Sequence, residues 1–341
     1  MKEKVIIYGT GKAATNFYKV DFDHNQFTLI AFSDGNTDKQ EQYFFDSLII
    51  PPQQIKYTDY DKVIIASVFF EEIYESLTTQ YEIPGDRIVN THYKESERIK
   101  ERYLDYYGKY RNQNQNRKLI TIDETEKILI YTAIAGSYDT LRDPLVVNDR
   151  CRYICFTDDL SIKSEIWEVR PLDIINNDMV RSAKRLKVLP HEYFNEYSWS
   201  IWVDGKFQIK RDLVELIQKN TLYSNFLSFM HYKRSRVFDE AKTCIDLGFD
   251  DADIINKQIE AYKNDGFLDD NELIEGGVLF RKHNERNVIM LMERWWKEIN
   301  NHSRRDQISF NYCAWKEKFF FDVLELNIYD NPYLIRYPHN K

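Results

Sequence analysis

The stretch that decides the fold of the larger part of this chain is Trp199-Ser200-Ile201-Trp202-Val203-Asp204-Gly205-Lys206. Residues 199–203 are apolar except for one serine, so they predict a short buried strand. The strand stops at Asp204, and the carboxyl edge of a parallel sheet is where α/β folds bind their ligands. We therefore expect Asp204 to face a ligand site.

Further strands and helices are expected on both sides of this stretch. Apolar runs at 128–133, 153–156 and 167–169 predict three more strands, and residues 181–189 and 285–299 predict helices. Paired glycines, Gly276 and Gly277, stand ahead of another apolar run, where they would let a ligand approach the backbone. This alternation predicts a mixed α/β domain over 127–341.

Residues 1–92 repeat the alternation on a smaller scale. Short apolar runs at 5–8, 27–32, 63–66 and 87–90, with a helix near 71–80, predict a small parallel sheet of Rossmann type. Gly9 and Gly11 would permit the turn into the first helix, whose start attracts phosphate, and Asp34 would hold a ribose hydroxyl. A bound nucleotide and a structural or assembly role both stay open for this unit, and no redox cofactor is expected.

Residues 93–126 are interpreted as a connector. A helical arm with several tyrosines comes first, and the run Arg-Asn-Gln-Asn-Gln-Asn-Arg-Lys at 111–118 is too polar to join a core. We expect a domain boundary there. A homo-oligomer, if one forms, would use the amino-terminal unit or this arm.

Composition excludes several classes of function. The 341 residues are enough for two domains, and 47 basic against 55 acidic side chains give a net charge of −8, which argues against a nucleic-acid partner or a polybasic membrane role. No apolar run approaches the ~18 residues of a membrane span. The histidines and cysteines lack the spacing of a zinc site. A cytoplasmic location is expected, with peripheral attachment to the inner membrane face as a variant.

Basic residues nevertheless gather in three short clusters, and aromatic residues, 15% of the chain, flank them. Any one basic cluster could be a solvated helix face, but three around one proposed site favour an anionic substrate. The clusters are Arg181, Lys184, Arg185 and Lys187; Lys206, Lys210 and Arg211; and His231, Lys233, Arg234 and Arg236. The flanking rings are Tyr138, Trp202, Phe207 and Tyr232.

An ordered series of motifs resembles the glycosyltransferase-like domain family that includes the plant alkaline ceramidase and seed-mucilage proteins. The series comprises residues 131–139, Arg181 with Lys184 and 187–191, residues 200–205, His231 with Arg234 and 240–241, and residues 305–310. The resemblance covers 127–320 and implies a GT-A-like fold. Residues 1–92 resemble the short Rossmann-like modules found beside sugar-transfer domains in bacterial polysaccharide enzymes.

The resemblance implies roles for individual residues. Asp204 would face the diphosphate of a nucleotide-sugar donor, with Asp306 and Gln307 as further catalytic residues. Asp306 would be a base in an inverting reaction or an orienting group in a retaining one, and a helix N-cap is the structural alternative. The donor site would comprise Ala133, Gly136, Tyr138, Arg181, Lys184, Lys206, His231 and Arg234. The acceptor region would comprise Glu275, Gly276, Gly277 and Arg305.

Metal use is a separate question. Transferases of the GT-A type carry an Asp-x-Asp whose two carboxylates hold a divalent cation, whereas Lys206 stands at the second position here. Either Asp204 shares a Mn²⁺ or Mg²⁺ ion with distant ligands, or a cationic side chain supplies the charge of the metal.

We therefore expect a glycosyltransferase that moves a sugar from a nucleotide-activated donor to a glycan or lipid-linked acceptor. A growing surface polysaccharide, of capsular or lipopolysaccharide type, is the expected acceptor. The alternatives are a hydrolase of a lipid amide or glycosidic bond, a polyol-phosphate or sugar-phosphate transferase on the same fold, and a non-catalytic assembly protein.

Overall fold

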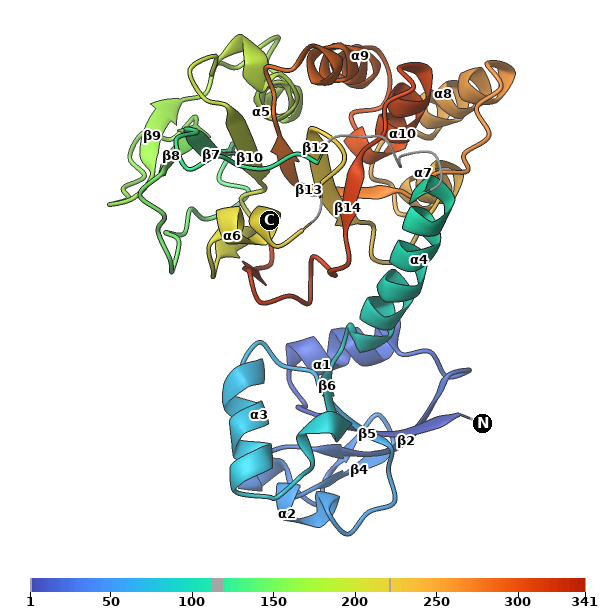
Figure 1. The fold of residues 1–341 in the computed structure, drawn as a ribbon. Coiled ribbons are helices and arrows are strands. Elements are labelled where there is room, and N and C mark those ends of the chain that lie inside the picture. Colours follow the sequence, from blue (N-terminus) through green and yellow to red (C-terminus); the bar gives the residue numbers. More distant parts are fainter. Residues whose placement is uncertain (1, 112–118, 221, 341) are drawn as a thin grey trace. The chain divides into compact units, whose positions relative to one another are not determined.

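The computed structural model describes residues 2–111, 119–220 and 222–340. The chain divides into two compact units, Met1–Lys94 and Glu95–Lys341, and each is built around its own sheet (Figure 1). Both units combine strands with helices, which confirms the predicted α/β class.

The amino-terminal unit has a six-stranded sheet in the order β3-β4-β2-β1-β5-β6. The central strand β1 (Glu3–Tyr8) runs parallel to both neighbours, β2 (Phe27–Ser33) and β5 (Lys62–Ile65). Apolar side chains of these strands are buried on the two faces of the sheet. The remaining elements are β3 (Tyr43–Phe44), β4 (Ser47–Ile50), β6 (Ile88–Asn90), α1 (Lys12–Asn16), which continues as a π-helical turn over Phe17–Asp21, α2 (Pro52–Ile55) and α3 (Phe70–Thr79).

The larger unit has a seven-stranded mixed sheet in the order β14-β12-β13-β10-β7-β8-β9. Strand β10 (Trp199–Val203) is parallel to β7 (Ile128–Ile134) and antiparallel to β13 (Ile274–Arg281). The other strands are β8 (Cys151–Thr157), β9 (Glu168–Pro171), β12 (Phe226–Met230) and β14 (Asp322–Leu324), and β11 (Phe207–Ile209) pairs with β15 (Leu334–Arg336) in a small separate sheet.

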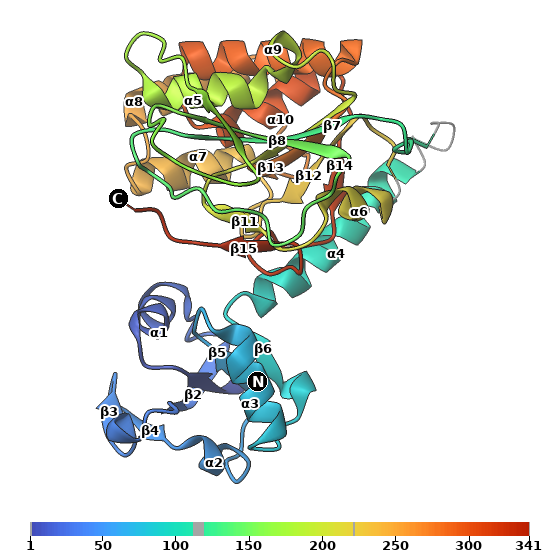
Figure 2. The ribbon, with the colours of Figure 1, turned by 90° about the vertical axis from the view of Figure 1, so that its left-hand side faces the viewer.

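Helices cover the sheet of the larger unit on both faces. The helices α5 (Met179–Val188), α7 (Val237–Asp246), α8 (Ala252–Asn264), α9 (Arg286–Asn301) and α10 (Asp306–Lys316) lie on one face, and α6 (Leu213–Gln218) lies with the β11–β15 pair on the other (Figure 2). Alternate residues of β7 enter the two cores: Leu129 and Tyr131 face the five helices, and Ile128 and Ile130 the opposite side.

The expectation of a separate helical arm is corrected by α4 (Tyr93–Arg111). Ile99 and Tyr106 of this helix are buried in the core of the larger unit. The Tyr106 hydroxyl donates to the carbonyl of Phe321 at 2.6 Å. The helix therefore belongs to the larger unit almost from its start, because its tyrosines supply apolar surface as well as hydroxyl groups. The polar run at 112–118 lies outside the described residues.

Among the described residues, no helix combines the length and the apolar composition that a membrane span requires.

Candidate active site

Asp204 lies at the carboxyl end of β10, as the sequence predicts. Its backbone N–H donates to the carbonyl of Gly277 in β13 at 2.8 Å. Its Oδ1 accepts the indole N–H of Trp202 at 2.7 Å. Two contacts, one from the neighbouring strand and one from its own, thus fix the carboxylate at the sheet edge. Its side chain keeps 30% of its surface exposed.

Two lysines of α5 converge on Asp306, the first residue of α10. Lys187 Nζ is 2.6 Å from Asp306 Oδ2, and Lys184 Nζ is 2.8 Å from Asp306 Oδ1. The Lys187 ammonium is also 3.6 Å from Asp204 Oδ1, so it bridges two carboxylates that are far apart in the sequence. Only 5% of the Lys187 side chain and 6% of that of Asp306 are exposed. We call Lys184, Lys187, Asp204, Lys206 and Asp306 the charge cluster.

Buried hydrogen bonds hold the two helices of the charge cluster in place. The Tyr131 hydroxyl donates to the carbonyl of Lys187 at 3.1 Å, and the buried Arg281 guanidinium donates to the same oxygen at 2.7 Å. On the other helix, the Trp295 indole N–H donates to the carbonyl of Asp306 at 2.9 Å. These bonds satisfy a carbonyl in the last turn of α5 and fix the first turn of α10.

The N-cap alternative for Asp306 is wrong, because Arg305 occupies the cap position of α10. The Asp306 carboxylate turns instead towards the two lysines. Burial opposes its ionisation, but Lys184 and Lys187 outweigh burial and hold the pKa of Asp306 well below its usual range. A carboxylate held so firmly in its ionised form is a poor proton acceptor.

The two lysines respond to the same environment in opposite directions. Burial lowers the pKa of Lys184 to about 8, although Asp306 counteracts part of this effect. Burial also opposes the charge of Lys187, but Asp204 and Asp306 together raise its pKa above the usual value. Lys187 is therefore the firmly charged centre of the cluster.

Gly276 and Gly277 lie inside β13, which corrects the expectation that they precede a strand. A Cβ on Gly276 would stand 3.3 Å from Lys187 Nζ and 3.4 Å from Asp306 Oδ2, and a Cβ on Gly277 would stand 2.9 Å from the Phe207 ring. The register of β12 and β13 is irregular at this point. The absence of side chains at the two glycines therefore leaves room for the Lys187 ammonium, the Asp306 carboxylate and the Phe207 ring.

A second group of buried titratable side chains borders the charge cluster. His231 Nε2 lies 3.6 Å from Glu240 Oε2 and 3.7 Å from Glu275 Oε2, and all three side chains are almost completely buried. Burial raises the pKa of Glu275 to about 7. Burial, with nearby arginines, lowers the pKa of His231 well below its usual value. Arg234 Nε donates to Glu240, so Arg234 holds this carboxylate.

Lys206 completes the charge cluster beside Asp204. Its Nζ is 4.0 Å from Asp204 Oδ2 and donates to the Tyr329 hydroxyl at 3.5 Å. The ammonium lies 5.2 Å from the centre of the Phe207 ring and 5.6 Å from that of Tyr329. The centroids of the two rings are 6.1 Å apart, and the rings are stacked.

Comparison with known proteins identifies the larger unit. Residues 110–332 match the family described as "TOD1/MUCI70, glycosyltransferase-like domain". The chain belongs to this family. The resemblance inferred from the motifs is thereby confirmed. Residues 1–89 match the family described as "C2185-like, N-terminal".

One relative of the TOD1/MUCI70 family is the Arabidopsis thaliana protein named "Probable hexosyltransferase MUCI70". The two sequences are 26% identical over 223 aligned residues, and the match covers 57% of this chain and 38% of that protein. The match thus spans less than half of the relative's length.

The loop after β7 of the TOD1/MUCI70-like domain lies beside the turn that carries Asp204. A Cβ on Gly205 would stand 3.0 Å from the Cβ of Asp139, which places the loop against residue 205. Gly136 adopts φ +59°, and its N–H donates to Asp158 Oδ1 at 2.9 Å. Tyr138 is exposed, and its ring lies 4.3 Å from that of His339. Ala133 is half-buried in β7.

Arg181 does not join the charge cluster, and its assignment to the donor site stays a prediction. Its Nε donates to the carbonyl of Ile299 at 3.1 Å, and its Nη2 donates to that of His302 at 2.9 Å. Asp178, the N-cap of α5, pairs with its remaining nitrogen. Arg181 therefore ties the start of α5 to the end of α9. Arg305 and Gln307 lie at the start of α10, where Arg305 Nη2 donates to Gln307 Oε1 at 3.3 Å.

In the amino-terminal unit, Gly9 adopts φ +110°, and a Cβ there would stand 3.0 Å from the carbonyl oxygen of Ala66. Gly11 precedes α1, and a Cβ there would meet nothing within 4 Å. Asp34 accepts the backbone N–H of Thr10 at 3.1 Å and pairs with Lys39. Its carboxylate thus fixes the glycine-rich loop, whereas the sequence predicted that it would hold a ribose.

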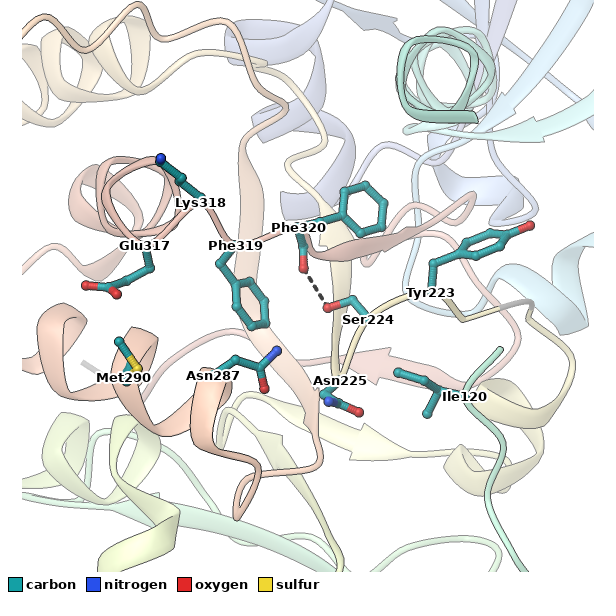
Figure 3. A pocket seen from close by; sticks show the side chains of 10 residues that line it. All are labelled: Ile120, Tyr223, Ser224, Asn225, Asn287, Met290, Glu317, Lys318, Phe319 and Phe320. Carbon is teal, nitrogen blue, oxygen red and sulfur yellow. Dashed lines mark hydrogen bonds between the residues drawn. The ribbon is translucent and has the colours of Figure 1, made fainter. Parts of the chain in front are cut away.

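A surface pocket of the TOD1/MUCI70-like domain lies apart from this site (Figure 3). Tyr223, Ser224 and Asn225, which precede β12, form part of its lining, and Ser224 donates to the carbonyl of Phe320 at 2.6 Å. His231 follows the same strand at its other end. The pocket and the charge cluster therefore occupy opposite edges of the sheet.

Sequence reasoning named Lys187 and Glu240 within motifs but did not assign them to the site. Lys184 and Lys187 are three residues apart in the predicted helix, and this spacing places both on one face. That signal was present in the sequence. Tyr329 carried no comparable signal, because only the fold brings it beside Lys206.

Proposed function

We propose that this protein is a glycosyltransferase that uses a nucleotide-activated sugar donor. The observation that carries the proposal is the charge cluster, which gathers three ammonium groups and two carboxylates at the carboxyl end of β10 in a glycosyltransferase-like domain. Ammonium groups held in a partly desolvated site stabilise the negative charge that develops on a departing diphosphate. The three lysines present several N–H donors that an anionic ligand could accept.

The proposed reaction is a single exchange of bonds at the anomeric carbon. The bond from this carbon to the diphosphate oxygen breaks, and its electron pair stays on the diphosphate. The acceptor hydroxyl oxygen forms the new glycosidic bond and gives its proton to a base. Catalysis would come from holding donor and acceptor in line and from neutralising the leaving group.

Glu275 is the base that we propose for an inverting form of this reaction. It lies one residue from Gly276, next to the charge cluster, and burial raises its pKa to about 7. The titratable groups around it are His231, Glu240, Lys206, Asp204 and Lys187. The low pKa of Asp306 supports an orienting role for that residue rather than a role as base.

For the acceptor we retain the prediction of a glycan, and more narrowly of a growing surface polysaccharide of capsular or lipopolysaccharide type. The relative's printed name, a probable hexosyltransferase, supports a hexose as the transferred group. Donor hexoses carried by UDP, GDP and CDP are therefore the first to test.

The test measures nucleoside diphosphate release from a panel of UDP-, GDP- and CDP-hexoses, with and without oligosaccharide acceptors. We expect release from one donor to rise with the acceptor, and Asp204→Asn to abolish it. Lys219→Met, which removes an exposed charge at the end of α6, serves as the matched control. If no donor is bound or consumed, and Asp204→Asn behaves as the wild type does, the proposal is refuted. Consumption that is equally fast without an acceptor would favour the hydrolase alternative.

A further inference from the structure

The residues around Asp204 do not fit a divalent cation. Oδ1 already accepts the Trp202 indole N–H at 2.7 Å and faces Lys187 Nζ at 3.6 Å, and Oδ2 faces Lys206 Nζ at 4.0 Å. Within the part of the chain that the structure describes, no three His, Cys, Asp or Glu side chains converge to bind a metal. A divalent cation needs several oxygen ligands, and the lysines would repel it.

Lys206 stands where a second acidic ligand would be expected and carries the opposite charge. Its ammonium lies near the faces of the Phe207 and Tyr329 rings and beyond hydrogen-bond distance of Asp204 Oδ2. The ammonium is thus held in place by packing and by the weak Tyr329 contact rather than by a short ion pair. The ammonium N–H groups can therefore donate their strongest hydrogen bonds to an incoming anion.

The other two lysines of the cluster are engaged more tightly. Lys184 and Lys187 share the Asp306 carboxylate at 2.8 and 2.6 Å. They provide a fixed positive background beside Asp306, whereas Lys206 stands 4.0 Å from the carboxylate of Asp204 and follows Gly205, against which Asp139 packs. A diphosphate that binds beside Asp204 would therefore meet a Lys206 ammonium that is less tightly paired than those of Lys184 and Lys187.

We propose that this site neutralises the diphosphate of its donor with lysine ammonium groups instead of a divalent cation, and that Lys206 makes the decisive contact. The inference rests on the proposed function, because it assumes that a nucleoside diphosphate group binds beside Asp204. It specifies how that group is held and predicts binding that does not depend on metal. It also gives a reason for a lysine at the position of the second acid.

The test is isothermal titration of the full chain with UDP, GDP, CDP and ADP, first with EDTA and then with MnCl₂ or MgCl₂. We expect one nucleotide to bind with equal affinity in both conditions. Lys206→Met keeps an unbranched side chain and removes the charge, so it should weaken binding about tenfold or more, since the lost contact is a charge-assisted hydrogen bond. Lys206→Arg should restore most of the affinity, and Lys219→Met should change nothing.

The outcomes separate this inference from the proposed function. Binding that requires Mn²⁺ or Mg²⁺ overturns the inference and leaves the proposed function standing. Unchanged affinity in a folded Lys206→Met variant overturns it as well. If none of the four nucleotides binds with or without metal, both proposals fail. Thermal unfolding followed by tryptophan fluorescence checks that each variant is folded.

Discussion

Replacing Asp306 by asparagine tests whether the charge cluster is as buried as the structure indicates. The Asp306→Asn variant keeps the size of the side chain but leaves the ammonium groups of Lys184 and Lys187, now 2.8 and 2.6 Å from carboxylate oxygens, against a neutral amide. Breaking a buried ion pair from one side costs about 3–5 kcal/mol. Two charge-assisted hydrogen bonds at ~1.5–3 kcal/mol each lead to the same range.

Tryptophan fluorescence is a suitable assay for this variant. All six tryptophans lie between residues 167 and 315, so the signal reports the larger unit alone. Denaturant titrations should show a loss of about 3–5 kcal/mol in the unfolding free energy, and Tm should fall by about 10 °C for a unit of this size. The control is Glu215→Gln, which breaks an exposed pair with Lys219 and should cost less than about 1 kcal/mol.

The dependence of this loss on pH provides a second check. The pKa of Asp306 is depressed in the folded state, so its stabilising contribution is fully present above its ordinary value of 3.8 and is lost as the pH falls below it. The difference in unfolding free energy between the wild type and Asp306→Asn should therefore become smaller as the pH falls below that value. A loss of less than about 1 kcal/mol at neutral pH would refute the reasoning, because it would place the cluster with surface ion pairs.

Three further predictions concern the residues around the cluster. Because burial raises the pKa of Glu275 to about 7, kcat/KM should fall as the pH drops below that value. Glu275→Gln should lower kcat by about 10²–10⁴-fold and remove this acidic limb of the pH profile. An unchanged profile would exclude Glu275 as the base. Gly277→Ala would place a Cβ 2.9 Å from the Phe207 ring. The unfolding free energy of the larger unit, followed by tryptophan fluorescence, should therefore fall by about 1–3 kcal/mol. A neutral effect would contradict this packing of Gly277 against Phe207. Arg181→Ala should lower the unfolding free energy by about 1–3 kcal/mol while nucleoside diphosphate affinity stays the same. Weaker binding without loss of stability would instead support the assignment of Arg181 to the donor site.

Local patterns in the sequence were sufficient for much of the fold. The predicted strand at 199–203 coincides with β10, and the apolar spacing at 285–299 coincides with most of α9. Both depend on periodic burial of apolar side chains, which a sequence records directly. The α4 helix shows the limit of this reasoning, because its polar composition concealed the buried faces of Ile99 and Tyr106.

Charged residues were harder to assign from the sequence. Arg181, Lys184 and Lys187 belong to one basic helix, yet only the two lysines face Asp306. Arg181 and Lys184 have the same three-residue spacing as Lys184 and Lys187, so spacing alone does not separate them, and what each side chain meets depends on how α5 packs against α9 and α10. The role of Asp306 followed the same rule: a carboxylate at a helix start caps the helix or turns away according to its neighbours.

The sequence by itself determined the α/β class, the two-part organisation, the family and the position of Asp204 at a strand end. Each of these follows from local periodicity or from short ordered motifs. The tertiary structure decided which charges meet. Lys187 stays charged while buried only because β10 and α10 bring Asp204 and Asp306 to within 3.6 and 2.6 Å of its ammonium. Electrostatic interactions depend on distance and on exclusion of water, and neither quantity exists until the chain has folded.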